Sequence, residues 1–175
     1  MKKISLAVVG LATLGVLSFG QSAHAEETTA NVKVNSGGIK ISDVTNINFN
    51  DVTVSKGGTT TTEKDKSTVS IEDLRGSSSK GWTLTAQLKD NNFKGMSLNV
   101  VPKIEANTEV AEAGTKATLN SSPQMIATVS DEKVSSTEFD TNVSLNATLD
   151  VPAKQLSNTY TTTIVWNLAE GPVTQ

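Results

Sequence analysis

Few side chains in this chain could carry acid–base or nucleophilic chemistry. It has one histidine, His24, and no cysteine among 175 residues. Acid–base catalysis without them would need positioned carboxylates, as in the hydrolysis of glycosides. Two adjacent pairs exist, Glu72-Asp73 and Asp131-Glu132. The first pair would diverge on a strand, where neighbouring side chains point to opposite faces, and the second lies in a polar loop-like stretch. We therefore predict no catalytic residue, no metal site and no cofactor.

A second possible chemistry is recognition by aromatic side chains. Trp82 and Trp166 are the two tryptophans, and each precedes a leucine by two residues, Leu84 and Leu168. An indole offers a flat apolar face and an N–H donor, which suits the mixed surface of a sugar. An apolar stripe at strand period is nevertheless typical of a core. We favour core packing over direct ligand contact for each tryptophan, and both interpretations stay open.

Both tryptophans lie in segments whose side chains alternate strictly, Trp82–Leu88 and Tyr160–Leu168. Such alternation indicates β-strands with one buried face. Similar short runs recur along the chain, with turn signals between them: Ile39/Ile41, Ile47/Phe49, Val52/Val54, Val69/Ile71, Leu98/Val100/Ile104, Met125–Val129 and Val143–Val151. Eight to ten short strands without intervening helices predict an all-β fold, an antiparallel β-sandwich of Ig-like or Greek-key type.

Other segments read as connections or edges. Lys56–Lys66 is a low-complexity stretch that we interpret as a solvated loop in preference to an extended edge. Glu105–Gly114 has weak apolar spacing, and we expect a loop there. Pro102 interrupts an alternating run, and proline cannot donate to a ladder, so its segment should lie at a sheet edge or bulge.

The N-terminus has the features of a secretory signal peptide. Lys2 and Lys3 precede an apolar stretch, and Ala23-His24-Ala25 is a small-x-small cleavage site. We predict cleavage after Ala25, which divides the chain into a signal peptide, 1–25, and a single domain, 26–175. Cleavage would remove the histidine and both lysines, and the formal charge would change from −3 to −5.

The acidic balance and the single arginine, Arg75, argue against binding to nucleic acid, which depends on basic residues. They argue equally against electrostatic capture by an anionic polymer or membrane. After the signal peptide no stretch is apolar enough to span a bilayer. The tail has no sortase-type motif, and no cysteine is present for a lipid anchor. If the exported protein stays at a cell surface, we expect it to be held there non-covalently.

The turn Asp73-Leu-Arg-Gly76 comes shortly before the first tryptophan. Arg75 either pairs with Asp73 or Glu72 and fixes this turn, or it contacts a ligand. We favour the structural role for Asp73, Arg75 and Gly76, because an exposed charge pair is common and contributes only about 0–1 kcal/mol.

Together these motifs closely resemble the WxL domain, a family of cell-surface proteins of low-GC Gram-positive bacteria. The resemblance rests on Gly81-Trp-Thr-Leu84 after the Asp-x-Arg-Gly turn, on Tyr160–Leu168 followed by Gly171-Pro172, and on the opening segments Gly38–Val44 and Asn46–Phe49. It implies a secreted protein at the cell wall, bound non-covalently to peptidoglycan or another wall glycan. It also implies larger WxL-interacting surface proteins as partners.

One alternative remains at this point. The protein would then be an adhesion or assembly subunit whose main partner is a larger WxL-interacting surface protein or a host matrix component. Exposed edge strands, at Pro102 or in the threonine-rich segments, would accept a strand of such a partner.

Overall fold

A computed structural model describes residues 28–76, 80–90, 93–134 and 139–171. The chain divides into two compact units, Met1–Asn35 and Ser36–Gln175. The predicted cleavage site after Ala25, Ser77–Ser79 of the turn and Pro172 of the final motif lie outside the described residues.

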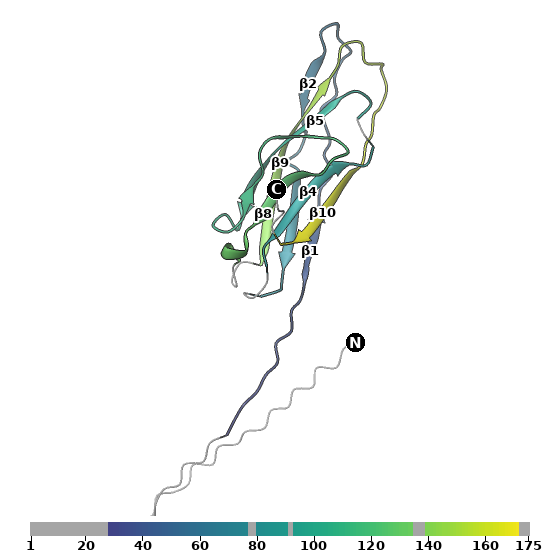
Figure 1. Ribbon diagram of the computed structural model, residues 1–175. Helices are drawn as coiled ribbons and strands as arrows, with labels where there is room; N and C mark the ends of the chain where they lie inside the picture. The colour runs from purple at the N-terminus through teal and green to yellow at the C-terminus, as the bar shows by residue number, and fades with distance from the viewer. Residues whose placement is uncertain (1–27, 77–79, 91–92, 135–138, 172–175) are drawn as a thin grey trace, which may run out of the picture. The chain divides into compact units, whose positions relative to one another are not determined.

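The second unit is a sandwich of two antiparallel sheets, as the sequence predicts (Figure 1). The six-stranded sheet has the order β1 (Ile39–Val44), β3 (Thr68–Asp73), β9 (Asp140–Val151), β5 (Ser97–Ala106) and β7 (Ala117–Leu119), and β2 (Thr59–Thr62) pairs with β9 as well. The four-stranded sheet has the order β10 (Ile164–Glu170), β4 (Trp82–Leu88), β8 (Gln124–Val129) and β6 (Glu112–Ala113). One short 3-10 turn, Asp131–Lys133, follows β8.

Strand β9 organises the larger sheet. Its twelve residues pair with β5 along one side, and on the other side with β3 first and then β2. Glu63 bridges the gap between β2 and β3, where its carboxylate accepts hydrogen bonds from the Ser67 hydroxyl and from the Ala147 backbone N–H at 3.2 Å. A buried backbone group without a hydrogen-bond partner would be costly. The Glu63 carboxylate gives the Ala147 N–H of β9 such a partner in the gap between the two strands.

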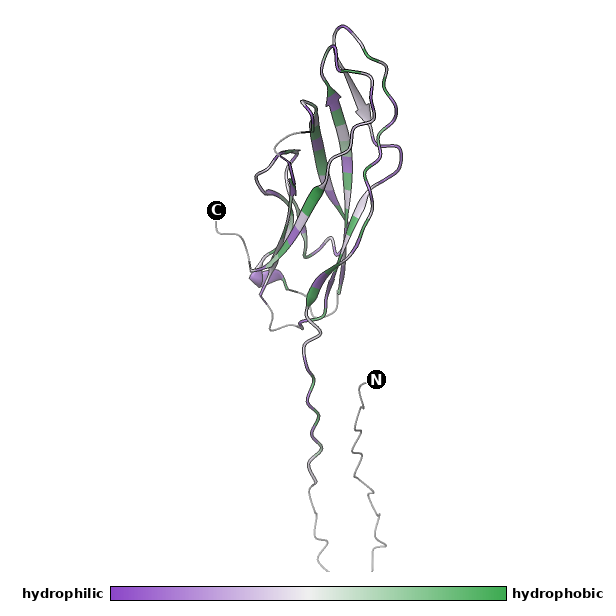
Figure 2. Ribbon diagram, turned by 90° about the vertical axis from the view of Figure 1, so that its right-hand side faces the viewer, coloured by the Kyte–Doolittle hydropathy of each residue, from purple (hydrophilic) through white to green (hydrophobic). Residues whose placement is uncertain are grey.

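The core lies between the two sheets and follows the predicted alternation. Apolar side chains of β9 and β4 point inward, and green and purple residues alternate along the strands in Figure 2. Pro102 is buried opposite Leu145, whose own N–H donates to the Ser67 carbonyl on the far side of β9 at 3.0 Å. The proline nitrogen therefore points away from β9, to a side where β7 pairs only with Leu98–Val100. The predicted edge position of Pro102 is confirmed.

The final strand is shorter than predicted. Strand β10 begins at Ile164, and the four residues before it, 160–163, are not in a sheet. The reason is the partner strand, because Ile164 pairs with Leu88, the last residue of β4. One further backbone bond, from the Lys89 N–H to the Thr163 carbonyl at 2.9 Å, ends the ladder. Residues 160–163 alternate as a strand would, but no residue of β4 remains for their backbone to pair with.

Three other predictions were wrong. Lys56–Lys66 contains β2, because the second half of β9, Thr148–Val151, offers its threonines a ladder. Ile47/Phe49 and Val52/Val54 do not form strands, and of the four only Phe49 makes a single bridge, to Glu63. Glu105–Gly114 includes the two-residue strand β6, which pairs with the edge of β8. In each case the outcome depended on a partner strand far away in the chain.

Candidate functional site: a cleft between two loops

The two Trp-x-Leu motifs lie side by side on adjacent antiparallel strands. Leu84 of β4 is directly opposite Leu168 of β10, and Trp166 is opposite Ala86. The pairing continues past the strand ends, where the Gly171 N–H donates to the Gly81 carbonyl at 2.7 Å. Because the strands run in opposite directions, Trp82 and Trp166 end up at opposite ends of the sheet.

Gly81, just before the first motif, packs closely against the neighbouring strand. A Cβ at this position would lie 2.0 Å from the Val129 carbonyl oxygen, and its N–H donates to the Asp131 carboxylate at 2.7 Å. Only glycine allows this approach without a shift of backbone. The close contact fixes the entry of the chain into β4 and with it the position of Trp82.

The two tryptophans differ in their surroundings. Trp82 is 2 % exposed and belongs to the core, together with the fully buried Leu84. Trp166 and Leu168 are only half-buried, although they occupy the inner face of β10. The interpretations that the sequence left open for both tryptophans therefore apply to them unequally: of the two, only Trp166 has surface left for a ligand.

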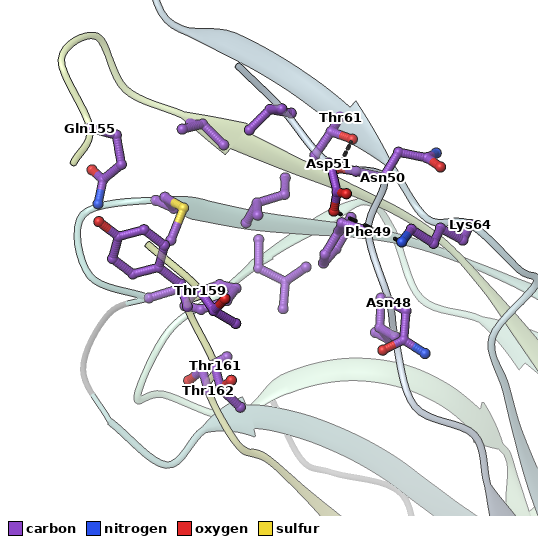
Figure 3. A pocket seen from close by; sticks show the side chains of 18 of the residues that line it. Asn48, Phe49, Asn50, Asp51, Thr61, Lys64, Gln155, Thr159, Thr161 and Thr162 are labelled. Carbon is purple, nitrogen blue, oxygen red and sulfur yellow. Dashed lines mark hydrogen bonds and ion pairs between the residues drawn. The ribbon is translucent and has the colours of Figure 1, made fainter. Parts of the chain in front are cut away.

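Trp166 lines a large cleft at one end of the sandwich. We call it the loop cleft: the space between residues 44–55, which lead from β1 towards β2, and residues 152–163, which lead from β9 to β10. Its volume is about 1670 Å³. Figure 3 shows side chains from both loops reaching into this space, with Asn48 and Asp51 on one side and Gln155 and Thr159 on the other.

The apolar part of the loop cleft is continuous with the core. Phe93 and Met96, each 6 % exposed, form part of its lining together with inner-face residues of β5 and β9. Half-buried aromatic side chains, Phe49, Tyr160 and Trp166, complete this part. Aromatic rings that are packed on one side and free on the other are the usual platforms for flat or ring-shaped ligands.

The polar part of the lining is almost free of charge. Amides and hydroxyls predominate, and they come from both loops: Thr45, Asn46, Asn48, Asn50, Thr53, Ser55, Gln155, Ser157, Asn158, Thr159, Thr161, Thr162 and Thr163. Three charged residues line the cleft, Asp51, Lys64 and Asp65, and the first two form an ion pair at 3.9 Å. This surface is suited to a neutral ligand with many hydroxyl or amide groups.

Hydrogen bonds hold both loops in place, through contacts to β2, within the second loop and between the loops. The backbone of Asn50 donates to the Thr62 carbonyl at 3.1 Å and accepts from the Thr61 hydroxyl at 2.9 Å. Within the loop on the other side of the cleft, the Tyr160 hydroxyl donates to the Leu156 carbonyl at 2.7 Å. The Lys154 N–H donates to the Ser55 carbonyl at 3.2 Å and so links the two loops. The cleft walls are therefore ordered by local bonds.

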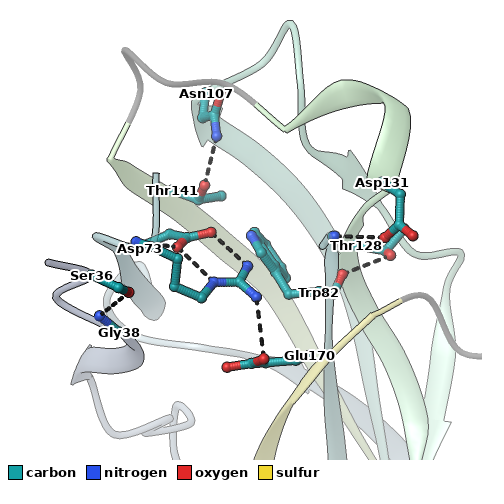
Figure 4. A network of polar contacts seen from close by, with 11 residues as sticks. Ser36, Gly38, Asp73, Trp82, Asn107, Thr128, Asp131, Thr141 and Glu170 are labelled. Carbon is teal, nitrogen blue, oxygen red and sulfur yellow. Dashed lines mark hydrogen bonds and ion pairs between the residues drawn. The ribbon is translucent and has the colours of Figure 1, made fainter. Parts of the chain in front are cut away.

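Arg75 lies at the other end of the sandwich, beside Asp73 at the end of β3 and Glu170 at the end of β10. Figure 4 shows Asp73 and Glu170 in this network of polar contacts. Its guanidinium donates twice to the Asp73 carboxylate, each time at 2.8 Å, and lies 3.8 Å from Glu170. The Arg75 side chain is only 7 % exposed, so the pair is buried and not exposed as the sequence led us to expect. Little of the guanidinium is left for a ligand.

Electrostatics at this pair agree with a structural role. Burial opposes ionisation of Asp73, but the hydrogen bonds and the charge of Arg75 outweigh it and hold the pKa of Asp73 below its ordinary value. The hydrogen bond with Asp73 raises the pKa of Arg75 against the effect of burial. Both groups are ionised across the physiological range.

Three of the four carboxylates that we considered for catalysis, Glu72, Asp73 and Asp131, are already engaged in structural contacts. Glu72 pairs with Lys40 at 2.6 Å, whereas Asp73 binds Arg75. Asp131 accepts the Gly81 N–H. Within the described residues, no three histidine, cysteine or acidic side chains form a group that could hold a metal ion.

The sequence reasoning missed the loop cleft itself. The sequence pattern placed Asn46–Phe49 among the opening strands and gave no sign of a binding loop before Tyr160. One signal was available, since Asn46–Phe49 and Asn158–Tyr160 each combine asparagine with an isolated aromatic residue. Their meeting could not be inferred, because the loops are about a hundred residues apart and only the sandwich brings them together.

Comparisons with known proteins agree with the motif analysis. A protein-family model described as "WxL domain surface cell wall-binding" matches residues 21–172, which is most of the chain. No match to a curated protein was found. No helix in the described part of the chain has the length and apolar character needed to cross a membrane.

Proposed function

The chain belongs to the WxL family of surface cell wall-binding domains, and from this premise we propose that it is a non-catalytic protein that attaches non-covalently to the wall through the loop cleft. The ligand that we propose is a neutral part of peptidoglycan, most simply its glycan strand. The protein is then secreted and resides at the surface of a Gram-positive cell.

One observation carries the proposal: Trp166 is half-buried on the wall of a cleft whose other lining groups are mostly uncharged amides and hydroxyls. A sugar ring presents an apolar face to stack on an aromatic ring and hydroxyls around its edge to bond with amides. The formal charge of −3 makes attraction to anionic wall polymers unfavourable, so recognition must come from such neutral contacts.

Sedimentation with purified sacculi tests the proposal. Asn48→Asp places a charge on the exposed rim of the loop cleft, where it would be desolvated against a neutral ligand, and we expect at least about tenfold weaker binding. Asn146→Asp is the matched control, because Asn146 is also an exposed asparagine but lies on the outer face of β9, outside the cleft lining. Both variants change the net charge identically, so equal losses would count against the cleft.

A second arm of the experiment addresses the assembly alternative. Purified protein that does not sediment with clean sacculi, but does so once a wall-protein extract is added, would overturn direct wall binding. The protein would then be an assembly subunit held by another surface protein. Sedimentation without any added protein, lost in Asn48→Asp only, supports the proposal.

A further inference from the structure

The segment before the sandwich has the pattern of a strand but pairs with no strand in the described part of the chain. We call residues 28–35, Thr-Thr-Ala-Asn-Val-Lys-Val-Asn, the arm. Its apolar residues, Ala30, Val32 and Val34, alternate with asparagine and lysine, the pattern of a strand with one apolar face. Val32 and Val34 are 88 % and 86 % exposed. Two fully exposed valines at strand spacing suggest a surface that becomes covered elsewhere.

The sandwich has a matching gap along β10. Among the described residues β10 pairs with β4 alone, so its outer edge offers free N–H and C=O groups. The inner-face residues Ile164, Trp166 and Leu168 are half-buried. Their partners on β4 are almost completely covered: Leu88 1 %, Ala86 1 % and Leu84 0 % exposed. One more strand beside β10 would cover the exposed parts of Ile164, Trp166 and Leu168.

We propose that the arm of one molecule adds as an antiparallel strand to the free edge of β10 in a second copy. With Val32 opposite Trp166, Val34 lies opposite Ile164 and Ala30 opposite Leu168. All three apolar residues of the arm then face the incomplete part of the core. Backbone hydrogen bonds supply the affinity and the alternating side chains fix the register.

A second copy fits this edge better than the molecule's own arm. Two hydrogen bonds of 2.8 Å, from the Gly37 N–H to the Leu74 carbonyl and from the Leu74 N–H to the Gly38 carbonyl, continue the β1–β3 ladder. Only Ser36 then separates this ladder from the arm. This ladder end lies near Glu170, the end of β10, because Arg75 contacts both Asp73 and Glu170. An arm of the same molecule on β10 would therefore have to run parallel to it. A second molecule is free to pair antiparallel, which is the more stable arrangement per residue.

Charge also favours a copy of this chain as the partner. Lys33 is the one charged residue in the arm, whereas the whole chain carries a formal charge of −3. The arm therefore brings a positive charge to a molecule whose net charge is negative. The contact is head-to-tail, since the arm and the β10 edge are different surfaces of one protein. Such contacts build a ring where the rotation between copies closes and an open chain where it does not.

Engineered cysteines test the inference cleanly, because the chain has no cysteine of its own. In the proposed register Lys33 lies opposite Val165, at a Cα separation of about 4.5–5.5 Å that a disulfide spans. Exported Lys33→Cys protein is mixed with Val165→Cys protein and oxidised with diamide. We expect mixed disulfide dimers at several times the yield obtained with Met125→Cys. Met125 is a matched control at 39 % exposure against 40 % for Val165.

Equal yields with Val165→Cys and Met125→Cys would overturn the proposal. So would a monomer that cross-links internally in the Lys33→Cys/Asn167→Cys double variant, since that is the parallel pairing expected of the molecule's own arm. Adding Val32→Asp and Val34→Asp to Lys33→Cys should abolish the mixed dimer without affecting folding, as both valines are exposed. Val32 would lie against Trp166, which also lines the loop cleft, so the same two substitutions should leave binding to sacculi equal or stronger. Loss of the mixed dimer is therefore distinguishable from loss of wall binding.

Discussion

Leu84 and Leu168, the leucines of the two Trp-x-Leu motifs, are directly opposite each other across β4 and β10. The motifs are thus two halves of one antiparallel pair. Leu84 is completely buried, whereas Leu168 is half-buried at the sheet edge. The pair joins the inner strand β4 to the edge strand β10. The register of this pairing places the two tryptophans at opposite ends of the sheet.

This pairing predicts unequal and coupled effects of truncation. Leu84→Ala should lower the free energy of unfolding by about 2–5 kcal/mol, and Leu168→Ala by less, because part of its side chain is already in water. The double variant should be less destabilised than the sum by roughly 0.5–1 kcal/mol. Urea unfolding of the four proteins measures the coupling, and strict additivity would show that the leucines do not interact.

The tryptophans should separate stability from binding. Trp82→Ala removes a core residue and should cost about 3–5 kcal/mol of stability. Trp166→Ala should cost no more than about 2 kcal/mol, but should abolish sedimentation with sacculi under conditions where the variant is folded. Urea denaturation and sacculus binding are measured on the same preparations. If Trp166→Ala binds as well as the unmodified protein, Trp166 is not part of the wall site.

The buried Asp73–Arg75 pair should be worth far more than an exposed one. Asp73→Asn removes the carboxylate that binds the buried guanidinium twice, leaves only Glu170 at 3.8 Å as a counter-charge, and should destabilise the protein by roughly 3 kcal/mol. The control is Glu72→Gln, which breaks the exposed pair with Lys40 and should cost about 0–1 kcal/mol. Thermal unfolding compares the two directly. A similar small loss in both variants would mean that burial adds nothing to the pair.

Acid should weaken the fold from about pH 4.5 downwards. Hydrogen bonds from Lys66, Ser144 and Lys103 lower the pKa of Glu105 from 4.5 to about 2. A carboxyl with a lowered folded-state pKa stabilises the protein above the unfolded-state value, and that contribution is lost as the pH falls through the folded-state pKa. The pKa values of Asp73 and Asp150 are also lowered and act in the same direction.

Glu105→Gln tests this pH dependence. The variant should show a flatter fall in urea midpoint between pH 4.5 and about 2 than the unmodified protein, and little difference in slope above it. Asp51→Asn serves as the control, since Asp51 is fully exposed and its ion pair is long. An unchanged acid profile in Glu105→Gln would assign the acid sensitivity to other carboxylates.

Binding to the wall should depend little on salt. A neutral ligand in a cleft of amides, hydroxyls and aromatic rings releases no counterions, and an acidic protein gains nothing from anionic polymers. Sacculus affinity should therefore change by less than about threefold between roughly 0.05 and 0.5 M NaCl. A steep loss of affinity with salt would show that charged groups carry the interaction and would contradict a neutral ligand.

By itself the sequence determined the fold class, the main strands and the family. Period-two alternation in Trp82–Leu88 and in Val143–Val151 predicts strands because each inner position is buried by the opposite sheet. The Asp-x-Arg-Gly turn and the two Trp-x-Leu motifs are local patterns, and they lie within the stretch that the family model matches, residues 21–172. These properties depend on residues close together in the chain, so a single sequence carries them.

Only the tertiary structure decided which tryptophan is buried and where the loop cleft lies. Trp82 and Trp166 have the same local pattern, but β4 is covered on both sides by neighbouring strands and β10 on one side only. For the same reason β10 begins only at Ile164, and β2 forms within a threonine-rich stretch. Exposure and pairing depend on neighbours that come from distant parts of the chain, and the local pattern contains no record of them.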